Sequence, residues 1–257
     1  MNDTSLRKIA GGLLILTPIA FNVFFTMLSM TFAYPDILRE PASDVLRKFD
    51  EGGNGLVATW YGFMLTAVLF IPLAVLVHKV LARPDTPYMA VATAFGAVAG
   101  VVQFLGLVRW PFLVPYFAET YLDPASSDAT EEPVTVVFEA FNRYAGVAVG
   151  ENLGYLFTAL WTGFVALALL GSALPFRRWL GLLGVVSASS ILVGILEPAG
   201  FTPAANVVVV GYIMWSVWLA MFGIVVLRSS LHTSRLPLAQ AVSDPINQIE
   251  TLAGSRS

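Results

Sequence analysis

The stretch LVATWYGFMLTAVLFIPLAVLV, which runs from Leu56 to Val77, decides the fold of this chain. It carries no charged side chain, and it is long enough to cross the roughly 30 Å hydrocarbon core of a bilayer, which takes about 20 apolar residues. Its residues do not alternate between polar and apolar, as they would in a strand of a membrane β-barrel. Because a helix pairs its backbone groups within one segment, the stretch predicts a transmembrane helix.

The composition of the whole chain supports a membrane protein. Of its 257 residues, 57% are hydrophobic and only 12% are charged, whereas soluble domains have about 25% charged residues. This is too little charge to cover a surface that faces water, so the apolar surplus is expected to face lipid. The formal net charge of -3 provides no basic surface for nucleic acid.

Five other stretches have the same character, so the sequence predicts an all-α fold, a polytopic membrane helix bundle of about six transmembrane helices. The expected spans are residues 9–33, 56–77, 86–108, 152–174, 179–196 and 205–227, within a single domain that covers residues 1–228. The first span could be a signal peptide, because Arg7 and Lys8 precede it. Its apolar run is longer than the about 7–15 residues of a signal peptide, so we expect a retained helix.

The basic residues predict the orientation of the bundle, because loops rich in lysine and arginine stay in the cytoplasm. Six spans put nine of the 14 basic residues on the side of the chain ends and five on the other side. The nine are Arg7, Lys8, Lys79, Arg83, Arg177, Arg178, Arg228, Arg235 and Arg256, and the five are Arg39, Arg47, Lys48, Arg109 and Arg143. We therefore expect the N-terminus and the C-terminus in the cytoplasm.

Both long connections lie on the outer side in this arrangement. The first contains an amphipathic segment, residues 42–49, whose apolar residues recur at helical spacing. The second opens at Trp110 with an aromatic stretch that suits the membrane interface. Its second half, residues 134–150, is also amphipathic and could continue without a break into the fourth span. The tail, residues 229–257, is polar and is expected to be disordered cytoplasmic chain.

Polar residues gather around the beginning of the fourth span, at the outer membrane boundary. Glu139 and Arg143 are at pairing distance on a helix, and Gly146 and Gly150 continue that face as a ridge which lets another helix approach. The candidate ligand-binding residues are Arg109, Glu139, Asn142, Arg143, Glu151, Asn152 and Glu197. The alternative is a surface ion pair with helix packing, since exposed pairs are common and nearly neutral in energy.

Three of these residues stand at ends of spans. Glu151 precedes a long uncharged run, and an ionisable residue at that depth is costly and often functional, although it could simply mark the end of the span. Arg109 could extend to lipid phosphate groups, or turn inward to pair with Glu151 or Glu197. In a bundle these side chains and Arg143 reach one depth, where they could form a closed ion-pair network or bind a polar head group.

No motif of known chemistry is present. The chain has no cysteine, which excludes disulfides, thiolate metal sites and a cysteine nucleophile. His78 and His232 are far apart in the sequence, and there is no HExxH, P-loop or GxSxG element. We expect no metal and no cofactor, and the sequence leaves open whether the protein is an enzyme.

Four short segments stand out when they are taken in order. They are LFIPLA (Leu69–Ala74), FNRYAG (Phe141–Gly146), GENLG (Gly150–Gly154) and LEP (Leu196–Pro198). In this order they resemble an uncharacterised family of bacterial multi-pass membrane proteins, a domain of unknown function, over about residues 9–228. The resemblance implies a protein of the bacterial inner membrane with about six helices. It implies no activity, substrate or catalytic residue.

Three functions of different classes remain open. The first, which we favour, is a binding, sensory or structural protein without catalysis, whose partners are membrane lipids and a lipid-like or small-molecule ligand. The second is a membrane-embedded enzyme acting on a lipid or isoprenoid through an outer carboxylate such as Glu151. The third is a small transporter, which needs polar residues through the midplane. The midplane is almost purely apolar, so the transporter ranks last, and the isolated amides within the spans, Asn22, Gln103 and Asn206, are expected to form interhelical hydrogen bonds.

Overall fold

A computed structural model of the chain describes residues 3–171 and 175–254, with side chains for residues 3–171 and 178–229. Within these ranges the chain is helical and has no strand. Six helical segments are long and apolar enough to cross a membrane: Asp3–Phe32, Ala42–Leu81, Met89–Leu122, Asp128–Leu170, Arg178–Ala199 and Ala204–Ser229. The prediction of an all-α, polytopic bundle with six spans is confirmed.

Several of these segments are built from more than one helix. The first two spans are α1 (Asp3–Phe32) and α2 (Ala42–Leu81), with a 3-10 turn, η1 (Asp36–Arg39), between them. The third consists of α3 (Met89–Leu107), α4 (Arg109–Phe112) and α5 (Val114–Leu122), and the fourth of α6 (Asp128–Phe141), the π-helix η2 (Asn142–Leu153) and α7 (Gly154–Leu170). The last two are α8 (Pro175–Leu192) with the 3-10 helix η3 (Val193–Ala199), and α9 (Ala204–Gly254). Residues 172–174, the expected end of the fourth span, lie outside the described ranges.

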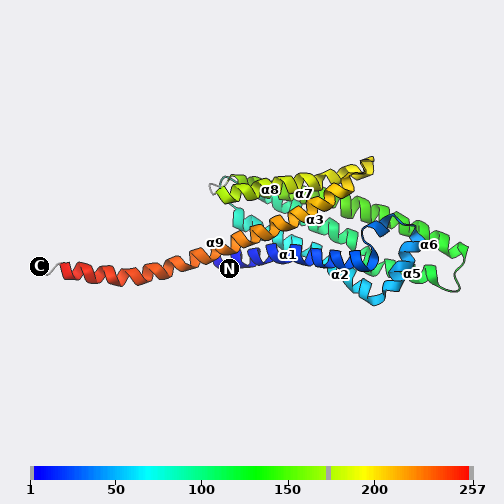
Figure 1. Ribbon diagram of the computed structural model, residues 1–257, viewed down its shortest axis with the longest axis horizontal. Helices are drawn as coiled ribbons and strands as arrows, with labels where there is room; N and C mark the ends of the chain where they lie inside the picture. The colour runs from blue at the N-terminus through cyan, green and yellow to red at the C-terminus, as the bar shows by residue number, and fades with distance from the viewer. Residues whose placement is uncertain (1–2, 172–174, 255–257) are drawn as a thin grey trace.

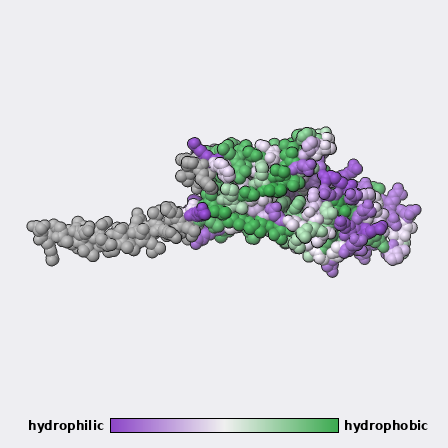
Figure 2. Space-filling model, in the orientation of Figure 1, coloured by the Kyte–Doolittle hydropathy of each residue, from purple (hydrophilic) through white to green (hydrophobic). Residues whose placement is uncertain are grey.

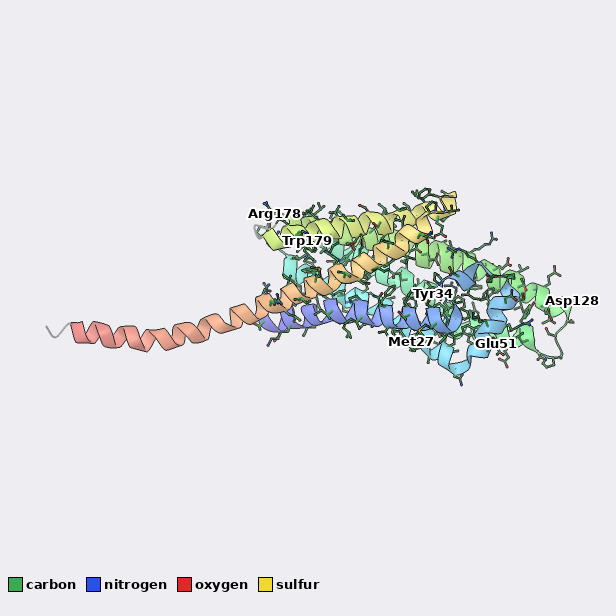
Figure 3. All side chains as sticks on the ribbon, viewed as in Figure 1. Met27, Tyr34, Glu51, Asp128, Arg178 and Trp179 are labelled. Atoms are coloured by element: carbon green, nitrogen blue, oxygen red, sulfur yellow. The ribbon has the colours of Figure 1, made fainter. Side chains whose placement is uncertain are left out.

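The spanning helices form a closed ring in chain order. α1 packs on α2, α2 on α3, α3 on α7, α7 on α8, α8 on α9, and α9 returns to α1. α5, α6 and the beginning of α2 form a cap at one end of the ring, and the first residues of α1 lie at the other end (Figure 1). A hydrophobic belt covers the ring, and the cap is hydrophilic (Figure 2). Glu51 and Asp128 lie in the cap, and Arg178 lies at the opposite end (Figure 3).

Aromatic side chains fill the ring at two levels. At the inner level Phe70 packs edge-on against Trp161 and Trp215, with ring centroids 4.8 Å and 5.5 Å away. Under the cap Trp60 and Trp110 stack in parallel, with centroids 4.5 Å apart. Burying such large rings contributes much of the packing energy of a bundle, because lipid supplies little hydrophobic drive between helices.

The amphipathic segment expected at residues 42–49 is the first part of α2. Its three large apolar residues Val45, Leu46 and Phe49 are buried in the cluster under the cap. α2 then bends at Gly53, whose φ of 52° lies in the left-handed region that glycine adopts without steric cost. The bend lets one continuous segment cover the end of the ring and then cross the membrane.

The backbone of residues 229–254, for which the sequence predicts disorder, continues α9 as a helix to Gly254 and forms the arm that leaves the ring in Figure 1. Residues 229–236 contain neither glycine nor proline. Nothing in the sequence therefore ends the helix where its apolar run stops. Residues 255–257 lie outside the described ranges.

Two glycine contacts set how the helices cross. A Cβ atom on Gly106 of α3 would lie 2.5 Å from the Cα atom of Gly150 in η2, so the two backbones touch. On the other side of the ring, a Cβ on Gly223 of α9 would lie 2.8 Å from the carbonyl oxygen of Gly11 in α1. Small residues at such crossings let helices approach closely, as the glycine ridge in the sequence predicts for Gly150.

We expect Gly106→Ala to destabilise the protein, because the new methyl group would meet backbone that cannot move aside. Overpacking of this kind costs about 1–3 kcal/mol. The matched control is Gly163→Ala in α7, where a Cβ meets nothing within 4 Å and where alanine gains about 0.5–1 kcal/mol over glycine in a helix. Thermal unfolding in detergent, followed by tryptophan fluorescence, measures both, and equal melting temperatures would contradict the contact.

Candidate ligand-binding cavity

A cavity of about 660 Å³ lies inside the half of the ring next to the cap. This volume is typical of sites for small molecules, which measure about 300–1,000 Å³. Its walls come from α1, α2, α3, α4, α7, α9, η1, η2 and η3. Its apolar lining includes Phe21, Phe25, Phe63, Leu107, Val208, Val209 and Ile213. The charged side chains Arg109, Glu151 and Glu197 also line it, from α4, η2 and η3.

Arg109 is the buried charge of this cavity. Only 8% of the residue is exposed, and its guanidinium lies 5.0 Å from the ring centre of Trp110. Nε and Nη2 donate to the side-chain oxygen of Asn142, at 3.3 Å and 3.1 Å, and Nη1 donates to the carbonyl oxygen of Gly106. A guanidinium has five N–H groups and stays charged. Three of the five donate to these acceptors, so two N–H groups of Arg109 make no hydrogen bond to the described residues. Because the acceptors are neutral, they do not neutralise the positive charge.

Gly146 of η2 makes room for this guanidinium. A Cβ atom at Gly146 would lie 2.5 Å from Nη2 of Arg109, so the arginine head lies directly against the backbone of η2. The close contact of Gly106 with Gly150 brings η2 near enough for this, and Asn142 then reaches the guanidinium from one turn further away. Arg109 is thus held by α3 and η2 together.

The π-helix η2 decides which side chains face the cavity. Asn142 and Glu151 are nine positions apart, which is about two and a half turns of an α-helix but about two turns of the wider π-helix. In an α-helix the two would point in opposite directions. In η2 both Glu151, which lines the cavity, and Asn142, which binds Arg109, lie on the inner side. π-helical turns are rare and frequently occur at functional sites.

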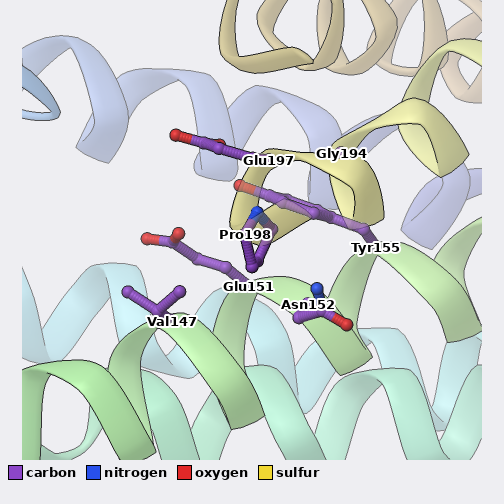
Figure 4. A pocket seen from close by; sticks show the side chains of 7 residues that line it. All are labelled: Val147, Glu151, Asn152, Tyr155, Gly194, Glu197 and Pro198. Carbon is purple, nitrogen blue, oxygen red and sulfur yellow. The ribbon is translucent and has the colours of Figure 1, made fainter. Parts of the chain in front are cut away.

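Glu151 also borders a second, smaller cavity of about 120 Å³, which Glu197, Tyr155, Val147 and Asn152 line with it. The two cavities adjoin, because Val147, Glu151, Tyr155 and Glu197 line both. The polar ends of Glu151, Tyr155 and Glu197 point in the same direction, whereas the amide of Asn152 points away from them (Figure 4). None of the described residues donates a hydrogen bond to the Glu151 carboxylate.

An ion pair joins two walls of the cavity at its outer rim. Arg39 of η1 lies 3.4 Å from a carboxylate oxygen of Glu197 in η3, and 3.6 Å from a carboxylate oxygen of Asp36. The Arg39 side chain is 57% exposed, so solvent screens these pairs and they contribute little energy. Of the two pairs, the one with Glu197 links η1 to η3, and the one with Asp36 lies within η1.

Tyr34, which follows α1, lines the cavity together with Arg109 and Glu151. Burial raises the pKa of its phenol well above the usual value, because a buried phenolate would lose its hydration. The negative charge of Glu151 raises this pKa further, and the positive charge of Arg109 lowers it. The phenol therefore stays protonated and can donate a hydrogen bond, and it is within electrostatic reach of both groups.

The structure brings together part of the residue set expected from the sequence. Arg109, Glu151 and Glu197 line the large cavity, Asn142 binds Arg109, and Asn152 lines the small cavity. The inward pairing considered for Arg109 does not form, since no ion pair in the described ranges joins it to a carboxylate. A functional role for these residues stays a prediction.

Glu139 and Arg143 lie outside this group. Both are exposed, neither lines a cavity, and within residues 3–171 and 178–229 no ion pair joins them. The helix widens at Asn142, between the two residues, so the four-residue spacing that aligns side chains on an α-helix no longer does so.

Several residues of the cavity were not in the expected set. Tyr34, Arg39 and Tyr212 come from other segments, and only the closed ring brings them to η2. Asn22 donates to Ser216 at 2.9 Å, and Gln103 donates to Thr158 at 3.0 Å, which confirms interhelical hydrogen bonds for both amides. Both also line the cavity, as Asn206 does. Among described residues, no three His, Asp or Glu side chains gather as a metal site would require.

Together the ring and the cavity define a multi-pass membrane protein with a partly polar cavity on the side of the cap. Residues 9–223 match the family described as "Domain of unknown function (DUF4386)", and the chain belongs to this family. The resemblance found in the sequence is confirmed at the level of the family, whose description names no activity. Comparison with curated proteins and with solved structures gives no match.

We expect Asn142→Ala to destabilise the protein, since it removes the acceptor of two N–H groups of a buried guanidinium. A buried donor left without a partner costs about 1–3 kcal/mol, and a charged one costs more. Arg143→Ala, one residue further along η2, is the control, and at this exposed position we expect a change within about 0.5 kcal/mol. Thermal unfolding in detergent measures both, and an equal loss in the two variants would contradict the role of Asn142.

Proposed function

We propose that this protein binds an amphiphilic molecule of the membrane in its outer cavity, as a binding or sensory protein without catalysis. One observation carries the proposal: a cavity with apolar walls contains a buried arginine whose charge no carboxylate neutralises within the described residues. A buried charge without a charged partner is costly. A ligand with an apolar body and a polar head would satisfy both parts of the cavity.

The arrangement of α1 and α9 supports access from the bilayer. The two helices touch at Gly11 and Gly223 and diverge toward the cap (Figure 1). In the diverging part, Val209 and Ile213 of α9 line the cavity and are also 41% and 55% exposed. Residues that face both the cavity and the outside form the rim of an opening. Since this rim lies on spanning helices, acyl chains would enter from the lipid.

A membrane enzyme acting on the same amphiphile is the second candidate, and Glu151 favours it. Its carboxylate faces the cavity and accepts no hydrogen bond from the described residues. Such a group could act as an acid or base on a bound lipid. Chemical change of the lipid during incubation with the protein would support this candidate.

We also propose that the protein lies in a bacterial inner membrane with both chain ends in the cytoplasm, as one transmembrane domain over residues 1–228. The distribution of basic residues supports this orientation, and membrane lipids are then its first partners.

Reporter fusions test the orientation. We expect a fluorescent protein fused after the last residue to fluoresce, and alkaline phosphatase fused there to be inactive, because the phosphatase folds only outside the cytoplasm. Phosphatase inserted after Asp123, in the turn between α5 and α6, should be active. The reverse pattern of activities would contradict the proposed orientation.

Native mass spectrometry of the protein released from mild detergent tests the proposed function. We expect one lipid to stay bound to the wild type and Val209→Trp to lower its occupancy about tenfold, equivalent to about 1.4 kcal/mol, because the indole would block the rim. The control is Val210→Trp at the next position, which is 54% exposed and does not line the cavity. A wild type without bound lipid, or equal loss in both variants, would refute the proposal.

A further inference from the structure

The charges that line the cavity fall into two groups. At the rim, Arg39 is paired with Glu197 and Asp36. Deeper, Arg109 and Glu151 carry opposite charges, and no ion pair of up to 4 Å joins them within the part of the chain that the structure describes. The inner group therefore has no net charge but contains two separate, unneutralised charges that face one space.

Packing keeps these two charges apart. Asn142, Gly106 and Gly146 hold the Arg109 guanidinium against η2, so it cannot move toward the carboxylate without losing its hydrogen bonds. Glu151 is on the same π-helix, two turns from Asn142. Tyr34 lines the same cavity as both groups. The contact of α3 with η2 therefore sets the gap between the Arg109 guanidinium and the Glu151 carboxylate.

Three tyrosines line the cavity together with Glu151. They are Tyr34, Tyr155 and Tyr212, and Tyr155 also lines the small cavity beside Glu151. The rings of Tyr155 and Tyr212 lie with their centroids 6.1 Å apart. Aromatic faces beside a carboxylate attract an ammonium group, and this attraction grows when the site is shielded from water.

A purely anionic head group would be attracted by Arg109 but repelled by Glu151. A purely cationic head group would be attracted by Glu151 but repelled by Arg109. Transfer of a net charge into a cavity with apolar walls is also costly. A head group with both charges is neutral overall and neutralises both side chains at once.

We propose that the ligand has a zwitterionic head group, with a phosphate or carboxylate at Arg109 and an ammonium group at Glu151. This inference rests on the proposed function of the cavity and adds the chemical class of its ligand. The two free N–H donors of Arg109 bind the anionic group, and the carboxylate and tyrosines bind the ammonium.

Lipid competition tests the inference. The full-length protein is incubated with equal amounts of a phosphoethanolamine lipid and an anionic phosphoglycerol lipid that have the same acyl chains, and bound lipid is counted by native mass spectrometry. We expect a preference of about tenfold for the zwitterionic lipid, or about 1.4 kcal/mol. Glu151→Gln keeps the shape of the side chain and removes its charge, so it should abolish or invert the preference. Glu139→Gln in α6, whose side chain is exposed and lines neither cavity, should leave it unchanged.

Soluble head groups give a test that needs no variant and distinguish two sources of the zwitterion. Glycerophosphoethanolamine should displace bound lipid, and glycerophosphoglycerol should not. If the soluble compound binds as tightly as the lipid, zwitterion recognition stands and the ligand comes from the aqueous phase.

The outcomes separate the two proposals. Lipid that the wild type retains and Val209→Trp loses supports the proposed function. If the wild type and Glu151→Gln then both bind the two head groups equally, the zwitterion inference falls and the proposed function stands. If neither lipid nor soluble head group binds, both fall.

Discussion

The contact between the backbones of Gly106 and Gly150 is the constraint on which the site depends. Because neither residue has a side chain, α3 and η2 approach until their backbones touch. Arg109 lies one turn after Gly106 and meets η2 at Gly146, which also lacks a side chain, and then at Asn142. Glu151 directly follows Gly150 and is placed by the same contact. One crossing thus fixes the positions of both inner charges, and any shift of α3 against η2 would change the distance between them.

The cavity follows from where the other helices cross. Lipid gives little hydrophobic drive for helices to associate, so they hold together where small residues allow close packing. α1 and α9 have such a contact at Gly11 and Gly223, near the end of the ring opposite the cap. The two helices diverge from this contact toward the cap (Figure 1), and the rings of Phe70, Trp161 and Trp215 pack at the level away from the cap. The cavity lies in the space between the helices on the side of the cap.

The sequence predicts the spans, because runs of about 20 apolar residues have a single stable form in a bilayer. It also predicts that Arg109, Arg143, Glu151 and Glu197 reach one level, and all of these except Arg143 line the large cavity. It does not predict η2, because periodicity arguments assume 3.6 residues per turn and fail where the helix widens. For the same reason the expected pair of Glu139 with Arg143 does not form. Tyr34 and Arg39 carry no pattern of their own, and only their position after α1, beside the closed ring, brings them to the site.

The separation of Arg109 and Glu151 bears on whether these residues form a structural clasp, that is, a closed ion-pair network between helices, or a binding site. In a clasp, opposite charges in a medium of low polarity would close into an ion pair, because their attraction increases as water is excluded. Here the arginine head is held back by neutral hydrogen-bond partners, so that the unliganded protein keeps two unneutralised charges beside an apolar cavity. The proposed ligand would recover the free energy of this arrangement by neutralising both groups. Because a ligand that binds only the folded protein stabilises it, the proposal also implies that the stability of the half of the ring next to the cap would depend on the bound lipid.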